Sequence, residues 1–190
     1  MTDLTQLGVK DIRDGVRAGD FTAREVAESF NAAVAGAAAL NAFIVTTPDH
    51  AMAAADKVDA ARAAGETLGT MAGVPIGMKD LFATHGVQTT AASHILEGFT
   101  PRYESTVSQK LWDAGAGMLG KLNLDQFAMG SSNETSYFGN VTSPWKKAGS
   151  NAAMSPGGSS GGSSSAVAAR IAPAATGTDT GGSIRQPAAF

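Results

Sequence analysis

Residues 155–165 read Ser155-Pro-Gly-Gly-Ser-Ser-Gly-Gly-Ser-Ser-Ser165, and residues 177–185 read Gly177-Thr-Asp-Thr-Gly-Gly-Ser-Ile-Arg185. Ten of the eleven residues in the first stretch are glycine or serine, which is a composition typical of flexible linkers. The flanks favour a folded segment instead, because Trp145 lies upstream and the apolar run Ala166-Val-Ala-Ala169 follows at once. A phosphate-binding loop is a further alternative. However, the Gly-Lys-Ser/Thr ending of a P-loop is missing and no GxGxxG motif occurs.

The second stretch places Ser183 directly after two glycines, a pattern that lets successive backbone N–H groups turn toward one point, as an oxyanion hole requires. Ser183 is therefore a candidate nucleophile. Its hydroxyl needs a base, and no histidine lies near either stretch. Lys79 follows the apolar run Val74-Pro-Ile-Gly-Met78, and burial there would favour a neutral amine that can accept a proton. The alternatives at this point are a surface lysine at a strand end and a serine in an ordinary turn.

The pattern of apolar residues changes along the chain. Up to about residue 68 it is helical, with helices predicted over residues 4–18, from a capping box at Thr22 to Glu25, and over 49–64. Glycines 19 and 65 are placed to end the first and third of these helices. Further along we expect strands at 74–78 and 116–120 and helices at 105–113, 123–129 and 164–170. This alternation predicts an α/β fold with an at least partly parallel sheet.

Composition excludes several functional classes. The formal net charge of −3 argues against direct binding of nucleic acid. The chain has no cysteine and three histidines, which argues against disulfides, thiolate zinc sites, a thiol nucleophile and a Ser-His-Asp enzyme. No apolar run approaches the length of a membrane span, and the first residues lack the basic start of a signal peptide. We therefore expect a soluble, cytoplasmic protein that does not contact a membrane.

Three motifs together resemble the amidase signature family from Gly73 to Phe190. They are the lysine after an apolar strand, the Gly-Gly-Ser-Ser-Gly-Gly loop and the Gly-Thr-Asp-x-Gly-Gly-Ser-Ile-Arg turn, in the family's order. Ser183 follows Ser159 by 24 positions, as the family pattern requires. The resemblance implies a mixed sheet covered by helices, with residues 1–68 as an N-terminal helical region. Residues 69–190 would be the N-terminal part of the amidase signature α/β domain, whose remainder is expected beyond Phe190.

The resemblance also implies roles for individual residues. Lys79, Ser159 and Ser183 would form the catalytic triad, with Ser159 bridging the lysine to the nucleophile after a cis peptide bond at Gly158–Ser159. Four backbone N–H groups would hold the oxyanion, namely those of Thr180, Gly181, Gly182 and Ser183. Met129 and Gly130 would contact the substrate, and no metal site is implied. The pair Asp179 and Arg185 is expected to have a structural role.

Within the family, the segments 101–106, 123–139, 147–153 and 184–188 are similar to the glutamine-hydrolysing A subunits of tRNA-dependent amidotransferases. These proteins need no cofactor of their own. They pass ammonia to a B subunit that binds the tRNA and uses ATP and magnesium, while a C subunit clamps the two. The alternatives are a stand-alone amidase that hydrolyses small amides, and a truncated chain without activity of its own. The choice between the Gln-tRNA and Asn-tRNA pathways, and the residues that bind the glutamine head group, stay open.

Overall fold

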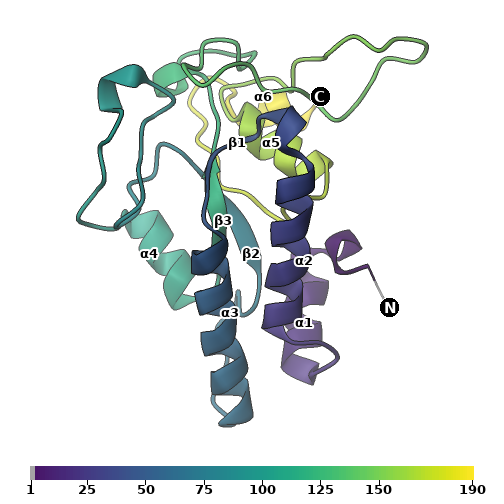
Figure 1. The fold of residues 1–190 in the computed structure, drawn as a ribbon, viewed down its shortest axis with the longest axis vertical. Coiled ribbons are helices and arrows are strands. Elements are labelled where there is room, and N and C mark those ends of the chain that lie inside the picture. The colour runs from purple at the N-terminus through teal and green to yellow at the C-terminus, as the bar shows by residue number, and fades with distance from the viewer. Residues whose placement is uncertain (1–2) are drawn as a thin grey trace.

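The computed structural model describes residues 3–190 as helices arranged around a small mixed sheet (Figure 1). The α-helices are α1 (Val9–Ala18), α2 (Ala23–Gly36), α3 (Pro48–Ala63), α4 (Thr106–Asp113), α5 (Gly161–Ala168) and α6 (Arg185–Ala188). The strands are β1 (Phe43–Thr46), β2 (Pro75–Lys79) and β3 (Gly117–Leu122). Short 3-10 turns occur at Leu4–Gln6, Ala38–Leu40, His94–Leu96 and Gln126–Ala128. The α/β class predicted from the sequence is confirmed.

Local capping signals set the end of α1 and the start of α2 as predicted, whereas the helix predicted from residue 4 begins only at Val9, after the 3-10 turn Leu4–Gln6. Gly19 ends α1 in the left-handed conformation, with φ of 82°, because glycine reaches this region without the steric cost of a Cβ atom. Thr22 caps α2 through a complete capping box, in which its hydroxyl accepts the Glu25 N–H and the Glu25 carboxylate accepts the Thr22 N–H. The sequence predicted a helix over 123–129, but the structure forms only the 3-10 turn Gln126–Ala128 there.

The sheet has the order β1-β3-β2. Strands β2 and β3 are parallel, with Lys79 opposite Leu122, while β1 pairs antiparallel with β3. Strand β1 is not predicted from the sequence, because its four residues lie between two strongly helical segments and are too few to show a clear alternation. The strand therefore joins the first part of the chain to the sheet formed by the second part.

The hydrophobic core lies between the sheet and the N-terminal helices. Helix α2 packs against α3, and α3 packs against β3. Figure 1 shows the two helices next to the sheet. Phe30 of α2 and Met118 of β3 are both fully buried in this core. The close approach of α3 to β3 depends on Gly117, where a Cβ atom would lie 3.2 Å from the Ala54 side chain. Across residues 3–190 the structure has no helix long and apolar enough to cross a membrane.

The far edge of β2 is covered by the chain after α5. Gly77 donates its N–H to Ala174 O at 3.1 Å, and Thr176 donates its N–H to Gly77 O at 3.0 Å. The bridge between Gly77 and Ala175 is parallel, so residues 174–176 extend the sheet in the direction of β2. The carboxyl ends of β2, β3 and this segment therefore meet at one edge, which is where open α/β sheets place their sites.

Candidate active site

Lys79 is the last residue of β2, and it is fully buried at the carboxyl edge of the sheet. Its ammonium nitrogen contacts three hydroxyl oxygens, those of Ser159 at 2.9 Å, Ser160 at 2.8 Å and Thr178 at 2.8 Å. The lysine and the first predicted serine of the triad are therefore in direct contact, although 80 residues separate them in the chain. The alternative of a surface lysine is excluded.

The surroundings of Lys79 make its neutral form easier to reach. Burial lowers the pKa of Lys79 from 10.5 to about 8, against the opposing effect of the Asp125 and Asp179 carboxylates. A neutral amine has two N–H donors and one lone pair, so three hydroxyl neighbours can satisfy all three positions. The Ser160 hydroxyl also lies 3.5 Å from the Thr178 carbonyl, to which it can donate its hydrogen. Ser160 then accepts an N–H of Lys79, and the lone pair is left for the hydroxyl of Ser159 or of Thr178.

The glycine-serine stretch is an ordered turn and the start of a helix, so the flexible-linker interpretation is wrong. The Gly158–Ser159 peptide bond is cis, as the family resemblance implies. Helix α5 begins at Gly161, three residues before the predicted start. Its first turn docks on the end of β3, because the Gly162 N–H donates to Asn123 O at 3.0 Å and a Cβ atom at Gly162 would overlap that oxygen. The serines therefore project from a rigid support.

Asp179 organises the turn that carries Ser183. Its carboxylate accepts the backbone N–H groups of Gly182 at 2.8 Å and of Ile184 and Arg185 at 3.0 Å, and it forms an ion pair with the Arg185 guanidinium at 2.9 Å. These contacts hold the pKa of Asp179 well below its usual range, with the Arg185 side chain as the largest cause. The structural role expected for this pair is confirmed.

Ser183 contacts the loop before α5 through its backbone, at the residue that follows Ser159. Its carbonyl accepts the Ser160 N–H at 3.2 Å. In residues 3–190 no hydrogen bond joins its hydroxyl to Ser159, so the relay from Ser183 to Ser159 stays a prediction. The Gly182 N–H donates to Asp179, which differs from the expectation that four N–H groups point to one oxygen. The N–H groups of Thr180, Gly181 and Ser183 donate to no group within residues 3–190, so a role for these three in an oxyanion hole stays a prediction.

Met129 and Gly130, the two residues expected to contact substrate, lie on the turn before the segment 131–135. Met129 is 81% exposed, whereas Gly130 packs against the Asp125 side chain. Gln186 connects this turn to residues 155–160, the serine loop, because its amide nitrogen donates to Ser131 O at 3.0 Å and its amide oxygen accepts the Gly158 N–H at 2.9 Å. The turn therefore borders the triad, and a contact with substrate stays a prediction.

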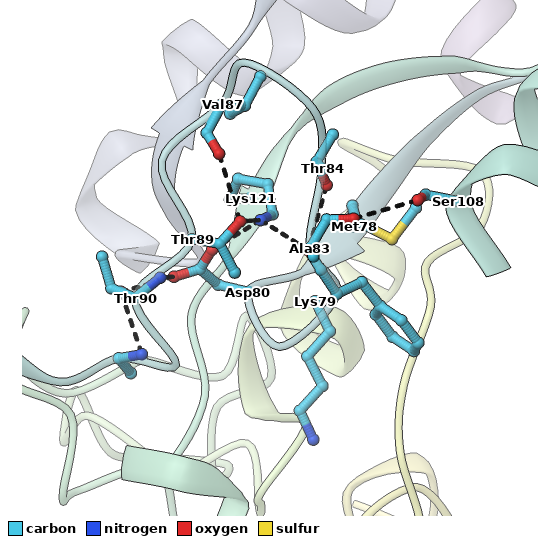
Figure 2. Close-up of polar contacts among 12 residues, drawn as sticks. Met78, Lys79, Asp80, Ala83, Thr84, Val87, Thr89, Thr90, Ser108 and Lys121 are labelled. Atoms are coloured by element: carbon cyan, nitrogen blue, oxygen red, sulfur yellow. Dashed lines mark hydrogen bonds and ion pairs between the residues drawn. The ribbon is translucent and has the colours of Figure 1, made fainter. Parts of the chain in front are cut away.

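A second buried lysine supports the end of β2 from the opposite side. The Lys121 ammonium lies 2.9 Å from Asp80 Oδ1, and it donates to Thr89 Oγ1 at 2.6 Å and to Phe82 O at 3.0 Å. The other Asp80 oxygen accepts the Thr90 hydroxyl at 2.6 Å. Figure 2 shows Lys79 directed away from this cluster, since successive residues of a strand point to opposite faces. The ion pair fixes the backbone from which Lys79 projects.

Replacing Lys121 by methionine is expected to lower the free energy of unfolding by about 3 kcal/mol, because a buried Asp80 carboxylate loses its cation. Urea denaturation measures the change, with the exposed Lys10→Met as the matched control. The double variant Asp80→Asn with Lys121→Met removes both charges and is expected to recover part of the loss. A Lys121→Met variant as stable as the Lys10 control would contradict this role.

Several residues of the site were not identified from the sequence. Ser160 and Thr178 are next to predicted residues in the two motifs, and this position was the only feature of the sequence that could have indicated their contact with Lys79. The roles of Asp125 and Gln186 in the site could not be predicted from the sequence, because their contacts form only when distant segments of the chain meet. Among residues 3–190, no group of three His, Asp or Glu side chains is placed to hold a metal ion.

Comparison with protein families matches residues 25–190 to the Amidase family. A curated relative, the A subunit of the glutamyl-tRNA(Gln) amidotransferase of Novosphingobium aromaticivorans, is 80% identical over 191 aligned residues, which cover all of this chain and 39% of the relative. The chain therefore spans about two fifths of the length of the curated relatives it matches.

Solved structures agree with this match. The A subunit of the Thermotoga maritima glutamyl-tRNA(Gln) amidotransferase has a TM-score of 0.77 at 33% identity, over 99% of this chain and 37% of that one. The native peptide amidase of Stenotrophomonas maltophilia has a TM-score of 0.85 at 32% identity, over 97% of this chain and 38% of that one. The fold and the sequence of this chain are thus both similar to those of amidases.

Proposed function

Because this chain belongs to the amidase family, we propose that its protein hydrolyses the side-chain amide of glutamine through a relay of Lys79, Ser159 and Ser183. The observation that carries the proposal is the buried Lys79 amine within 2.9 Å of the Ser159 hydroxyl, next to the turn that holds Ser183. A buried amine with a lowered pKa is a competent general base, and a serine near it is the group it can activate.

The proposed reaction follows from these contacts. Neutral Lys79 accepts the Ser159 proton while Ser159 takes the proton of Ser183, whose oxygen attacks the amide carbon. Backbone N–H groups of the turn stabilise the oxyanion, and the same relay returns the proton to the departing ammonia. Water then attacks the ester on Ser183 and releases glutamate. The groups that accept and return the proton all belong to this chain, so the proposed amide hydrolysis needs no cofactor.

The choice of glutamine rests on the curated relatives rather than on the fold. The TM-score to the peptide amidase, 0.85, is higher than the 0.77 to the Thermotoga maritima protein, so architecture alone leaves a stand-alone amidase as the second candidate. Identity of 60–80% to chains named as the A subunit of glutamyl-tRNA(Gln) amidotransferase favours the amidotransferase. In that proposal the ammonia passes to a B subunit, which would bind tRNA, ATP and magnesium in the cytoplasm, and a C subunit would hold the two together.

The test is a glutaminase assay of the full-length protein, purified with and without its partner subunits. We expect glutamate release with partners present, and we expect a B subunit to co-purify. If the protein instead purifies alone and hydrolyses small amides but not glutamine, the result would favour the stand-alone amidase. The 190-residue chain is assayed in parallel, and we expect it to be inactive, since in relatives the chain continues well beyond this segment.

The rate of amide hydrolysis is expected to rise with pH up to about 8, the pKa of Lys79, and then to level off. The sign follows from the role of the lysine, because only the neutral amine can accept a proton. Below that pKa the rate should fall by about tenfold for each pH unit. Initial rates across the pH range check this, with circular dichroism at each pH as a control for unfolding. A rate that does not change with pH would contradict a base role for Lys79.

A further inference from the structure

A carboxylate that the reaction above does not use lies beneath the serine loop. Asp125 follows β3 and is fully buried. In residues 3–190 it takes part in no ion pair, unlike the buried Asp80. A buried charge is strongly destabilising unless hydrogen bonds compensate it. The hydrogen bonds that the Asp125 carboxylate accepts must therefore compensate its burial.

Its hydrogen bonds run to one short segment. The Oδ2 atom accepts the Asn133 N–H at 2.9 Å, and the Oδ1 atom accepts the Thr135 hydroxyl at 2.9 Å and the Thr135 N–H at 3.4 Å. The backbone N–H of Asp125 itself donates to Ser159 O at 3.1 Å. Asp125 thus contacts the segment 131–135 through its side chain and a residue of the predicted triad through its backbone.

Steric contacts place the carboxylate between the serine loop and the turn before residue 131. A Cβ atom at Gly158 would overlap Asp125 Oδ2, and one at Gly130 would overlap Asp125 Cγ. The same layer continues at Gly161, where a Cβ atom would overlap Asn133 Oδ1. Glycine at these three positions allows the backbone to rest directly on Asp125 and Asn133.

We propose that Asp125 is a positioning residue for the reaction, whose carboxylate locks the segment 131–135 beneath Gly158 and so holds Ser159 in hydrogen-bonding distance of Lys79. The proposal rests on the function proposed above, because it assigns Ser159 a place in the proton relay. It adds a residue that neither touches the substrate nor carries a proton. Its effect is expected in the catalytic rate rather than in substrate affinity.

The charge of Asp125 gives a second, separable effect. Two carboxylates raise the pKa of Lys79 against the effect of burial, and they belong to Asp125 and Asp179. Asp80 and Lys121 lie on the opposite face of the strand as an ion pair without net charge. Removing the Asp125 charge is therefore expected to lower the pKa of Lys79, which a loss of packing alone would not do.

The first experiment compares Asp125→Asn with the wild type in the full-length protein with its partner subunits. We expect kcat to fall by roughly 10- to 100-fold with KM little changed, because misplacement of a reacting group acts on the chemical step. The acid limb of the pH profile should move about half a unit to lower pH. Asp20→Asn is the matched control, since Asp20 is exposed and its side chain makes no hydrogen bond to residues 3–190.

A second pair of variants separates the positioning effect of Asp125 from the effect of its charge. This pair also tests the positioning role if Asp125→Asn does not fold. Thr135→Val removes the hydroxyl that binds Asp125 Oδ1 but leaves the carboxylate charged. We expect a lower kcat with an unmoved pH profile. Thr135→Ser keeps the hydroxyl and should restore the rate. Equal kcat in the valine, serine and wild-type proteins would overturn the positioning role.

The pKa of Lys79 can be measured without any catalytic activity, so it tests the role of Asp125 independently of the proposed function. Carbon-13 NMR of the full-length protein with labelled lysine Cε atoms, with the Lys79 signal assigned by its loss in Lys79→Arg, gives the apparent pKa of Lys79 in wild type and in Asp125→Asn. If the wild type does not hydrolyse glutamine, the proposed function fails while a lowered pKa still supports the link from Asp125 to Lys79. An unchanged pKa together with an unchanged kcat in Asp125→Asn would overturn the inference.

Discussion

Replacement of Ser183 by alanine is expected to lower glutamine hydrolysis by about 10⁴-fold or more in the full-length protein, because it removes the attacking oxygen. The turn itself should persist. Asp179 holds it through the N–H groups of Gly182, Ile184 and Arg185, none of which needs the serine hydroxyl. The loss is therefore expected in the chemical step and not in folding, and thermal denaturation should give a midpoint close to that of the wild type.

Mass spectrometry identifies the nucleophile directly. An acyl adduct should appear on the peptide that contains Ser183 in the wild type, and it should be absent from Ser183→Ala. The matched control is Ser29→Ala, because Ser29 lies on α2, far from Ser183 in the sequence, and within residues 3–190 its hydroxyl bonds only to Glu25 O. An adduct on Ser159 or Ser160 would show that the roles of the serines are assigned wrongly.

Replacement of Lys79 by arginine is expected to reduce the rate by about 10³-fold, almost as much as replacement by alanine. A guanidinium stays protonated at every accessible pH and cannot act as a base. It is also larger than an ammonium, and the space around Lys79 Nζ is filled by three hydroxyls at 2.8–2.9 Å. Initial-rate kinetics of both variants, together with urea denaturation, separate loss of the base from loss of fold.

Lys57→Arg is the matched control for this substitution, since Lys57 is exposed on α3 and its replacement should leave both rate and stability unchanged. The pH profile adds a check, because any remaining activity of Lys79→Arg should lose the acid limb near pH 8. Activity near the wild-type level in the arginine variant would mean that position 79 contributes a positive charge rather than a base.

Much of the fold could be predicted from short-range patterns. The capping box at Thr22 and the glycine at position 19 indicated the helix boundaries correctly, because these signals act within one turn of the helix that they begin or end. Strand β1 could not be predicted because its pairing partner, β3, lies more than seventy residues further along the chain. The early start of α5 could not be predicted because its first turn is supported by Asn123 O, which no local pattern reveals.

The motifs alone were enough to identify the residues proposed to carry the chemistry, since Lys79, Ser159 and Ser183 stand in patterns whose order and spacing are specific. How these residues meet depends on the folded chain. The parallel register of β2 with β3 and with residues 174–176 brings Lys79 to Thr178 across 99 positions and to Ser159 across 80. The same packing buries Asp125 under Gly158. Motifs specify residue types locally, whereas burial, pKa and hydrogen-bond partners depend on contacts between segments that only the folded sheet brings together.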